Sequence, residues 1–306
     1  MPPTTAALGA IGNTPLIDLS LPDDCPGRLL AKAEFLQPGG SVKDRSALGC
    51  VEHGLATGAL SAGQPVVEMT SGNMGVGLAV VCNVLGHPFT AYMSCGNSPQ
   101  RAAMMRALGA AVVLVDQVDG TPGSVTGADI AAAEDRARSE AVARSAWYVD
   151  QFHNPGSVAA HQDGTAAEIW QQTGGDVDAF VACVGTGGTL IGAARGLKTR
   201  KAEVKAIAVE PENAAVLAGH DVTDPKHLLQ GAGYGSVPPH WDPSVVDGFL
   251  QVGDGDATQT RSWLAKRCGL HVGFTAAANV HAAMEWLRTN GGTAVTVLCD
   301  GGWKYE

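Results

Sequence analysis

The chain has 306 residues, which is enough for about two domains with a substantial core. Hydrophobic residues make up 45% of the chain and charged residues only 16%, against a usual charged share of about 25%. This composition excludes a disordered chain, and the net charge of −10 provides no basic surface for nucleic acid or anionic lipid, so small-molecule chemistry is expected.

The cysteines and the first residues indicate the compartment. The seven cysteines are scattered without a Cys-x-x-Cys pair, which is typical of reduced thiols and not of a disulfide frame or a zinc site. The stretch "MPPTTAALGAIGNTPL" lacks the basic and apolar regions of a secretion signal. The longest uncharged stretch, residues 69–100, is interrupted by polar residues and a proline. We therefore expect a cytoplasmic protein with no membrane span and no metal.

The first half of the chain alternates short apolar runs with amphipathic helical runs. Glycine, at 40 of 306 residues, is concentrated after the apolar runs. Strand, helix and strand at this spacing are typical of a parallel sheet with crossover helices. The pattern predicts strands over 65–69, 88–94 and 110–116, and helices over 76–86 and 98–109.

The second half repeats this pattern with nearly continuous apolar strands, which indicates burial on both faces. We expect an α/β fold with two open, twisted, mostly parallel sheets flanked by helices, and an active site in the cleft between two lobes. The smaller lobe is expected over residues 35–150, and the larger over 1–34 and 151–306. Further predicted elements are a strand, a glycine loop and a helix over 177–198, strands over 205–211 and 293–302, and helices over 256–270 and 275–290.

One lysine follows an unusual turn. In "PGGSVKDR", residues 38–45, a Pro-Gly-Gly turn and a capping serine place Lys43 in the first turn of a helix. The positive end of a helix disfavours a cation, so this position lowers the pKa of an amine. An unprotonated lysine can form an imine with an aldehyde, and Lys43 is a candidate for that chemistry.

Two glycine-rich loops are candidate anion sites. In "VGTGGTLIG", residues 184–192, main-chain N–H groups and a helix start can bind a phosphate. The loop lacks the spacing of G-x-G-x-x-G and of G-K-[ST], which counts against a dinucleotide oxidoreductase and an ATP site. The loop "TSGNMG", residues 70–75, suits a carboxylate or a phosphate. Plain packing and helix capping are the alternatives for both loops.

Other catalytic patterns are weak. The chain contains no G-x-S-x-G elbow and no H-E-x-x-H helix. His153 and His161 are interpreted as ordinary polar residues and not as ligands.

Several segments in one order resemble the cysteine synthase and cystathionine β-synthase family of pyridoxal-phosphate enzymes. The resemblance covers nearly the whole chain and implies the tryptophan synthase β-like fold, pyridoxal 5'-phosphate as cofactor and a homodimer. The segments are IGNTPLIDL, KAEFLQPGGSVKDR, EMTSGNMG, DQFHNPG, FVACVGTGGT, AVEP, VGFTAAAN and CDGGWKY.

Carried over to matching positions, the resemblance implies a role for each motif. Lys43 is the Schiff-base lysine and the base that removes the α-proton. Asn73 contacts the pyridine 3′-oxygen, and Thr275 occupies the place of a serine that faces the pyridine nitrogen. The cofactor phosphate is bound by Gly185, Thr186, Gly187, Gly188 and Thr189. The substrate carboxylate is bound by Thr70, Ser71, Gly72, Asn73, Met74 and Gln151.

Three positions depart from the family pattern. Met74 replaces the second threonine of T-S-G-N-T-G, Thr275 replaces serine, and Ala277 stands where glycine is common. Met74 keeps a main-chain N–H but loses a hydroxyl. These changes put substrate choice in doubt more than cofactor binding.

The resemblance implies β-elimination and β-replacement on an O-activated L-serine, with O-acetylserine and sulfide giving cysteine and acetate. Alternatives with the same machinery are O-phosphoserine as donor, or formation of cystathionine, S-sulfocysteine, cyanoalanine or diaminopropionate. A serine/threonine dehydratase is less favoured. A non-catalytic paralogue is disfavoured because Lys43 is intact. The expected partners are a small-molecule amino acid and a nucleophile, not nucleic acid or membrane.

Overall fold

The computed structural model describes residues 6–305. These residues form two compact units. The first unit holds the described residues up to Ile11 together with Lys43–Gly156, and the second holds Gly12–Val42 and the described residues from Ser157 onward. The chain therefore enters the first unit for the second time at Lys43.

The first unit is built on a four-stranded parallel sheet with the strand order β5-β4-β3-β6. Its last strand, β6, is only two residues long and pairs with β3 at one edge. The strands are β3 (Val66–Met69), β4 (Phe89–Ser94), β5 (Ala111–Val115) and β6 (Trp147–Tyr148), and the helices are α1 (Ala6–Gly9), α2 (Lys43–Thr57), α3 (Asn73–Leu85), α4 (Pro99–Ala107) and α5 (Gly127–Ala143).

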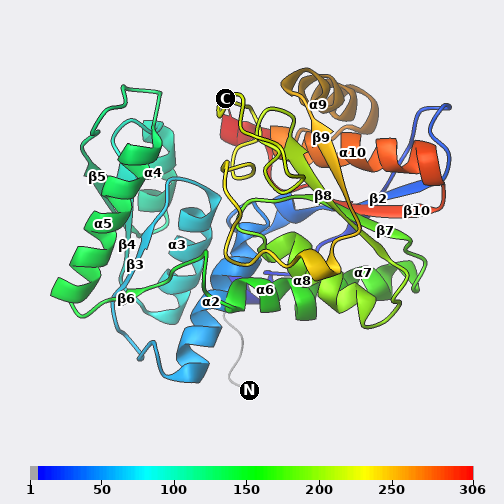
Figure 1. The fold of residues 1–306 in the computed structure, drawn as a ribbon. Helices are drawn as coiled ribbons and strands as arrows, with labels where there is room; N and C mark the ends of the chain where they lie inside the picture. The colour runs from blue at the N-terminus through cyan, green and yellow to red at the C-terminus, as the bar shows by residue number, and fades with distance from the viewer. Residues whose placement is uncertain (1–5, 306) are drawn as a thin grey trace. The chain divides into compact units, whose positions relative to one another are not determined.

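Helices cover both faces of this sheet. Successive residues of a strand point to opposite faces, and Val66 and Val67 of β3 accordingly belong to different apolar clusters. The cluster around Val66 contains side chains of α2, α3 and α4, whereas the cluster around Val67 contains side chains of α5. Figure 1 shows α5 on one side of the sheet and α3 on the other.

The second unit contains a six-stranded sheet with the order β1-β2-β10-β7-β8-β9, in which only β1 and β2 are antiparallel neighbours. The strands are β1 (Leu16–Leu19), β2 (Arg28–Lys32), β7 (Ala179–Cys183), β8 (Lys205–Pro211), β9 (Gly248–Val252) and β10 (Thr293–Val297). The helices are α6 (Gly156–Ala159, whose first residue belongs to the first unit), α7 (Ala166–Thr173), α8 (Gly188–Lys198), α9 (Asp254–Cys268) and α10 (Phe274–Asn290), with a π-helical turn over Ala160–Thr165 and 3₁₀ turns over Glu34–Leu36, Pro243–Val245 and Gly302–Tyr305.

The core of the second unit lies on both faces of this sheet. One apolar cluster joins the sheet to α9 and α10, and another joins it to α7 and α8. Figure 1 shows these two helix pairs on opposite sides of the strands. Strand β10 is buried along its whole length, as expected for a strand covered on both faces.

The expected fold class is confirmed, and most predicted elements occur within a few residues of their expected bounds. The helix predicted over 76–86 spans Asn73–Leu85, so its first turn includes the last residues of the glycine-rich segment. The antiparallel pair β1–β2 and the long helix α5 were not predicted. Among the helices of residues 6–305, none combines the length and apolar character that crossing a membrane requires.

Helix α8 packs closely on the chain that precedes α7. Gly188, Gly192 and Gly196 recur every four residues and so share one face of α8. A Cβ atom at Gly192 would clash with the main-chain oxygen of Val158, and one at Gly196 with that of Gln162. Because these three positions of α8 have no side chains, the helix can contact the main chain of Val158 and Gln162 directly.

We expect Gly192→Ala to lower the free energy of unfolding by about 1–3 kcal/mol, because the added methyl group forces two packed backbones apart. Chemical denaturation measures this loss. Gly255→Ala is the matched control: Gly255 lies in α9 with no atom within 4 Å of an added Cβ, and alanine is the better helix former. Equal stability of the two variants would contradict the packing argument.

A carboxyl group is buried in the sheet of the first unit. Glu68, in β3, is only 1% exposed, and burial raises its pKa to about 8. The negative charge of Asp150 contributes to this rise, while the main-chain N–H groups of Asp150 and Gln151 oppose it. At neutral pH, Glu68 is therefore mostly protonated.

This raised pKa predicts a pH-dependent gain from Glu68→Gln. Above the unfolded-state value near 4.5, the unfolded chain ionises while the folded chain keeps its proton, so stability is lost as pH rises toward 8. Glutamine does not titrate, and its advantage should grow by roughly 4 kcal/mol between pH 5 and pH 9. Melting temperatures of the wild type and Glu68→Gln across this pH range measure this advantage. Glu203→Gln, at an exposed turn, is the control. A Glu68→Gln difference that is constant with pH would show the assignment to be wrong.

Candidate active site

Lys43 is the first residue of α2, as the sequence predicts. The residue before it, Val42, belongs to the second unit, where its N–H donates to the main-chain oxygen of Cys299 at 2.8 Å. Lys43 itself is half-buried. The lysine thus stands at the amino end of a 15-residue helix, where the helix dipole favours the uncharged amine.

The loop after β3 leads directly into α3. Thr70 is buried, and its Oγ1 accepts hydrogen bonds from the N–H of Gly75 at 3.1 Å and of Gly72 at 3.5 Å. The N-cap of α3, Gly72, has no side chain to satisfy the first N–H groups of the helix. The main chain at residues 71–73 is therefore suited to binding a carboxylate.

The lysine and this loop meet within the first unit. Helices α2 and α3 cross at Gly77, where a Cβ atom would lie 3.1 Å from the main-chain oxygen of Lys43 and 3.2 Å from the Cα of Asp44. Glycine at this position, the fifth residue of α3, lets that helix come close to the first turn of α2. The amino-terminal parts of the two helices are thereby brought together.

The side chain of Met74 does not line this loop. It is 3% exposed and belongs to the apolar cluster that includes Met105 and Ala47. The position that departs from the family pattern therefore contributes a core side chain and a main-chain N–H.

Gln151 lies at the same edge of the sheet. It follows β6, which is parallel to β3, so the chain leaves both strands at their carboxyl ends. Asp150, directly before it, has a φ of 54°, a left-handed conformation that turns the chain sharply. Asn154 stabilises the turn: its N–H donates to the oxygen of Asp150 at 2.8 Å and its side chain donates to that of Val149 at 3.0 Å.

The second unit carries the other glycine-rich loop between β7 and α8. Thr186, Gly187 and Gly188 are buried, and Gly185 and Thr189 are half-buried. Gly187, the N-cap of α8, has a φ of 93° and offers no capping side chain. The loop offers helix N–H groups and two hydroxyls as donors, and it contains no acidic residue. Such a set of donors fits a phosphate ester.

Thr275 lies in the first turn of α10, in the same unit as this loop. Its hydroxyl donates to the main-chain oxygen of Gln230 at 3.0 Å. Its own main-chain oxygen faces the Cys183 thiol, 4.0 Å away, at the end of the strand that leads into the loop. Ala277, another departure from the family pattern, is fully buried in the core around α10.

Two residues near these loops were not identified from the sequence. His161 is fully buried in the π-helical turn, with Nε2 3.2 Å from Oγ1 of Thr189 and Nδ1 2.9 Å from Oγ1 of Thr165. Arg101 of α4 donates to the main-chain oxygen of Ser71 at 3.3 Å. The π-helical turn, of a kind often found at functional sites, has no sequence signal.

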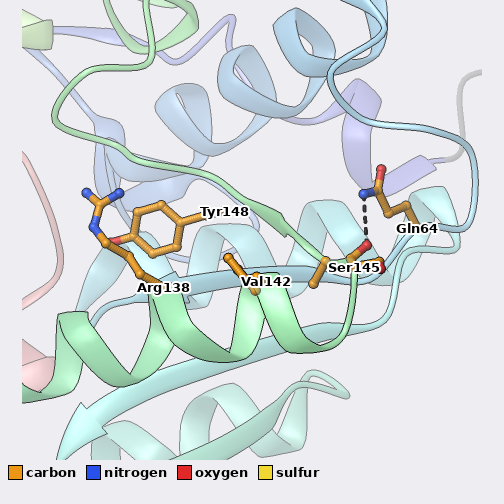
Figure 2. A pocket seen from close by; sticks show the side chains of 7 residues that line it. Gln64, Arg138, Val142, Ser145 and Tyr148 are labelled. Atoms are coloured by element: carbon orange, nitrogen blue, oxygen red, sulfur yellow. Dashed lines mark hydrogen bonds between the residues drawn. The ribbon is translucent and has the colours of Figure 1, made fainter.

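A cavity of about 470 Å³ in the first unit lies away from these groups. Figure 2 shows it beside the last turns of α5, with the Arg138 guanidinium over the ring of Tyr148 and Gln64 bonded to the oxygen of Ser145. None of the predicted site residues lines this cavity. Its lining residues are Gln64, Arg138, Ala141, Val142, Ser145, Ala146 and Tyr148.

The chain is similar to known proteins over nearly its whole length. The chain is 36% identical to a cysteine synthase of Staphylococcus aureus over 96% of this chain and 93% of that protein. The structure resembles O-acetyl serine sulfhydrylase isoform 3 of Entamoeba histolytica, with a TM-score of 0.89 and 33% identity over 98% of this chain and 89% of the other. It also resembles the O-acetylserine dependent cystathionine beta-synthase of Helicobacter pylori, with a TM-score of 0.88 and 31% identity over 100% and 98% of the two chains.

A family model described as pyridoxal-phosphate dependent enzyme matches residues 7–300, nearly the whole chain. The match spans both units, and with it Lys43, the two glycine-rich loops and Thr275. The chain therefore belongs to the family of pyridoxal-phosphate dependent enzymes.

Proposed function

We propose that this enzyme replaces the β-substituent of an O-activated L-serine. In the reaction that we favour, O-acetyl-L-serine and hydrogen sulfide give L-cysteine and acetic acid, with one C–O bond broken and one C–S bond formed. The observation that carries the proposal is the contact between α2 and α3 within one unit, since Lys43 begins α2 and the loop that we propose to bind the substrate carboxylate leads into α3. The similarity to cysteine synthases gives further support.

In the first unit, we assign cofactor attachment and substrate binding. Lys43 would hold the cofactor aldehyde covalently and, once displaced by the substrate amine, would take the proton from the substrate α-carbon. The main-chain N–H groups of residues 70–74 and the side chain of Gln151 would bind the substrate carboxylate, and Asn73 would donate to the cofactor's ring oxygen. Arg101 would stabilise the loop through the oxygen of Ser71.

In the second unit, residues 185–189 would bind the cofactor phosphate through main-chain N–H groups and the hydroxyls of Thr186 and Thr189. His161 would orient the hydroxyl of Thr189. Thr275 would face the pyridine nitrogen with a neutral hydroxyl. The cofactor itself supplies an electron sink for the carbanion formed at the α-carbon.

Formation of cystathionine is a second candidate. The structure is similar to the H. pylori protein whose name gives both O-acetylserine and cystathionine. The two reactions share the donor and differ in the thiol that attacks the β-carbon.

We also propose that the enzyme is a cytoplasmic homodimer. The scattered, odd-numbered cysteines favour a reducing compartment, and the resemblance to cysteine synthases favours a dimer.

We expect Lys43→Ala to abolish both the visible absorbance of the bound cofactor and turnover, because alanine removes the amine that forms the covalent link. Absorbance spectra after incubation with pyridoxal phosphate measure the first effect. Lys266→Ala, at an exposed position of α9, is the control and should retain both. A folded Lys43→Ala variant that still turns over would refute the role of Lys43.

A panel of serine derivatives tests the donor. We expect O-acetyl-L-serine to change the cofactor spectrum and sulfide to restore it, with release of L-cysteine. L-serine should react far more slowly, because hydroxide is a poor leaving group. A stronger response to O-phospho-L-serine would contradict the donor assignment, and restoration by L-homocysteine but not by sulfide would favour the cystathionine reaction.

A further inference from the structure

An amide side chain is buried in the apolar core around α10. Asn279 is 0% exposed, and the residues beside it in the helix, 276–278 and Val280, are buried and apolar. Asparagine is a poor helix former, and burying an amide is costly unless its polar atoms are hydrogen-bonded. An asparagine at this position of α10 therefore needs an explanation.

Both ends of this amide hydrogen-bond to main-chain groups. Its Oδ1 accepts from the N–H of Cys183 at 2.7 Å, and its Nδ2 donates to the oxygen of Val297 at 2.9 Å. Nδ2 also lies 3.4 Å from Sγ of Cys299. These partners settle the orientation of the amide, because a reversed amide would set donor against donor and acceptor against acceptor.

The two main-chain bonds take the place of one rung of the sheet. Strands β7 and β10 are parallel neighbours, and their pairing ends before this point. The N–H of Val184 donates to β8 and that of Leu298 to β2. Since successive residues direct their main-chain groups to opposite sides, Cys183 faces β10 and Val297 faces β7. A regular ladder would join these two groups directly, and the amide of Asn279 is inserted between them.

The amide also joins the first turn of α10 to the start of the glycine-rich loop over residues 185–189. Thr275 precedes Asn279 by one turn and shares its face of the helix. Cys183 is the last residue of β7, directly before this loop region. The main-chain oxygen of Thr275 lies 4.0 Å from the Cys183 thiol, so the helix and the strand end are adjacent here as well.

We propose that Asn279 is a positioning residue for the cofactor: its amide fixes the start of the loop over residues 185–189 relative to Thr275, so that one cofactor can bind to both. The inference rests on the proposed roles of this loop and of Thr275. It adds to them a residue that acts from within the core of the second unit.

The shape of the cofactor makes this distance important. Pyridoxal phosphate is a rigid ring with a short phosphate arm, so its phosphate and its ring nitrogen are a nearly fixed distance apart. If the loop moved relative to α10, the cofactor would keep one contact and lose the other. Groups that bind one rigid ligand need support from residues behind them, and Asn279 connects the elements that carry the two contacts.

The test compares Asn279→Leu with Thr296→Val. Leucine has a similar volume to asparagine but no hydrogen-bonding group. Thr296 is the matched control: it is fully buried, and its Oγ1 donates to the oxygen of Val181 at 2.7 Å across the same pair of strands. Both variants should have lower melting temperatures, because each leaves a buried main-chain group without this partner.

The affinity for the cofactor should distinguish the two variants. We expect Asn279→Leu to raise the dissociation constant of pyridoxal phosphate roughly five- to thirtyfold, and Thr296→Val to leave it nearly unchanged. Spectral titration of the full chain with pyridoxal phosphate measures this constant. An unchanged constant in Asn279→Leu, or an equal rise in Thr296→Val, would overturn the inference.

A double-mutant cycle with Thr275→Ala separates this inference from the proposed function. If Asn279 acts by placing Thr275, then Thr275→Ala should weaken cofactor binding less in the Asn279→Leu variant than in the wild type. Independent effects would overturn the role of Asn279 and leave that of Thr275 intact. No effect of Thr275→Ala in the wild type would show that the proposed role of Thr275 is wrong, and the role of Asn279 would fall with it. The amino-acid donor does not enter this measurement.

Hydrogen exchange provides a test that does not require Asn279→Leu to fold. In the wild-type holoenzyme, the amide of Cys183 lies beyond the β7–β10 pairing, yet it should exchange about as slowly as that of Val181 within it. Residue-resolved exchange measures this protection. Exchange of the Cys183 amide at the rate of an unprotected amide would overturn the inference.

Discussion

The close approach of α3 to α2 at Gly77 is the constraint on which the first unit's candidate site depends. With no side chain at Gly77, the main chain of α3 packs against the main-chain oxygen of Lys43. The distance between the main chain of Lys43 and the start of α3 is therefore set by backbone packing and not by flexible side chains. Any larger residue at position 77 would push apart the two groups that the proposed chemistry needs together.

The two candidate anion sites use the same physical device in two units. In each, a parallel strand ends, a glycine-rich loop follows, and a helix begins at a glycine N-cap, which itself has no side chain. Main-chain N–H groups at the start of a helix can contribute to an anion site. In the binding that we propose, a chain with so few charged residues would hold a phosphate and a carboxylate through the partial positive charge of oriented peptide groups.

The sequence was sufficient for the parts of the structure that depend on local pattern. Apolar runs gave the strands, and the turn before Lys43 correctly predicted a helix start there. Features that depend on tertiary packing could not be predicted from the sequence. Nothing in the residues around Glu68 indicates that Asp150 lies near it, since only the pairing of β3 with β6 brings the two segments together. His161 was interpreted as an ordinary polar residue because its contact with Thr189 arises only when α8 packs on the π-helical turn.

The hydrogen bond of Thr275 bears on the type of reaction that we propose. Its hydroxyl has one proton, which is donated to the oxygen of Gln230. To hydrogen-bond with a pyridine nitrogen, this hydroxyl would have two options. It would turn away from Gln230 and donate its proton to the nitrogen, or stay in place and accept a hydrogen bond from a protonated ring. Neither arrangement offers the negative charge that would hold a proton firmly on the nitrogen. A weaker electron sink favours rapid loss of a β-leaving group over long-lived carbanion chemistry, as β-replacement requires.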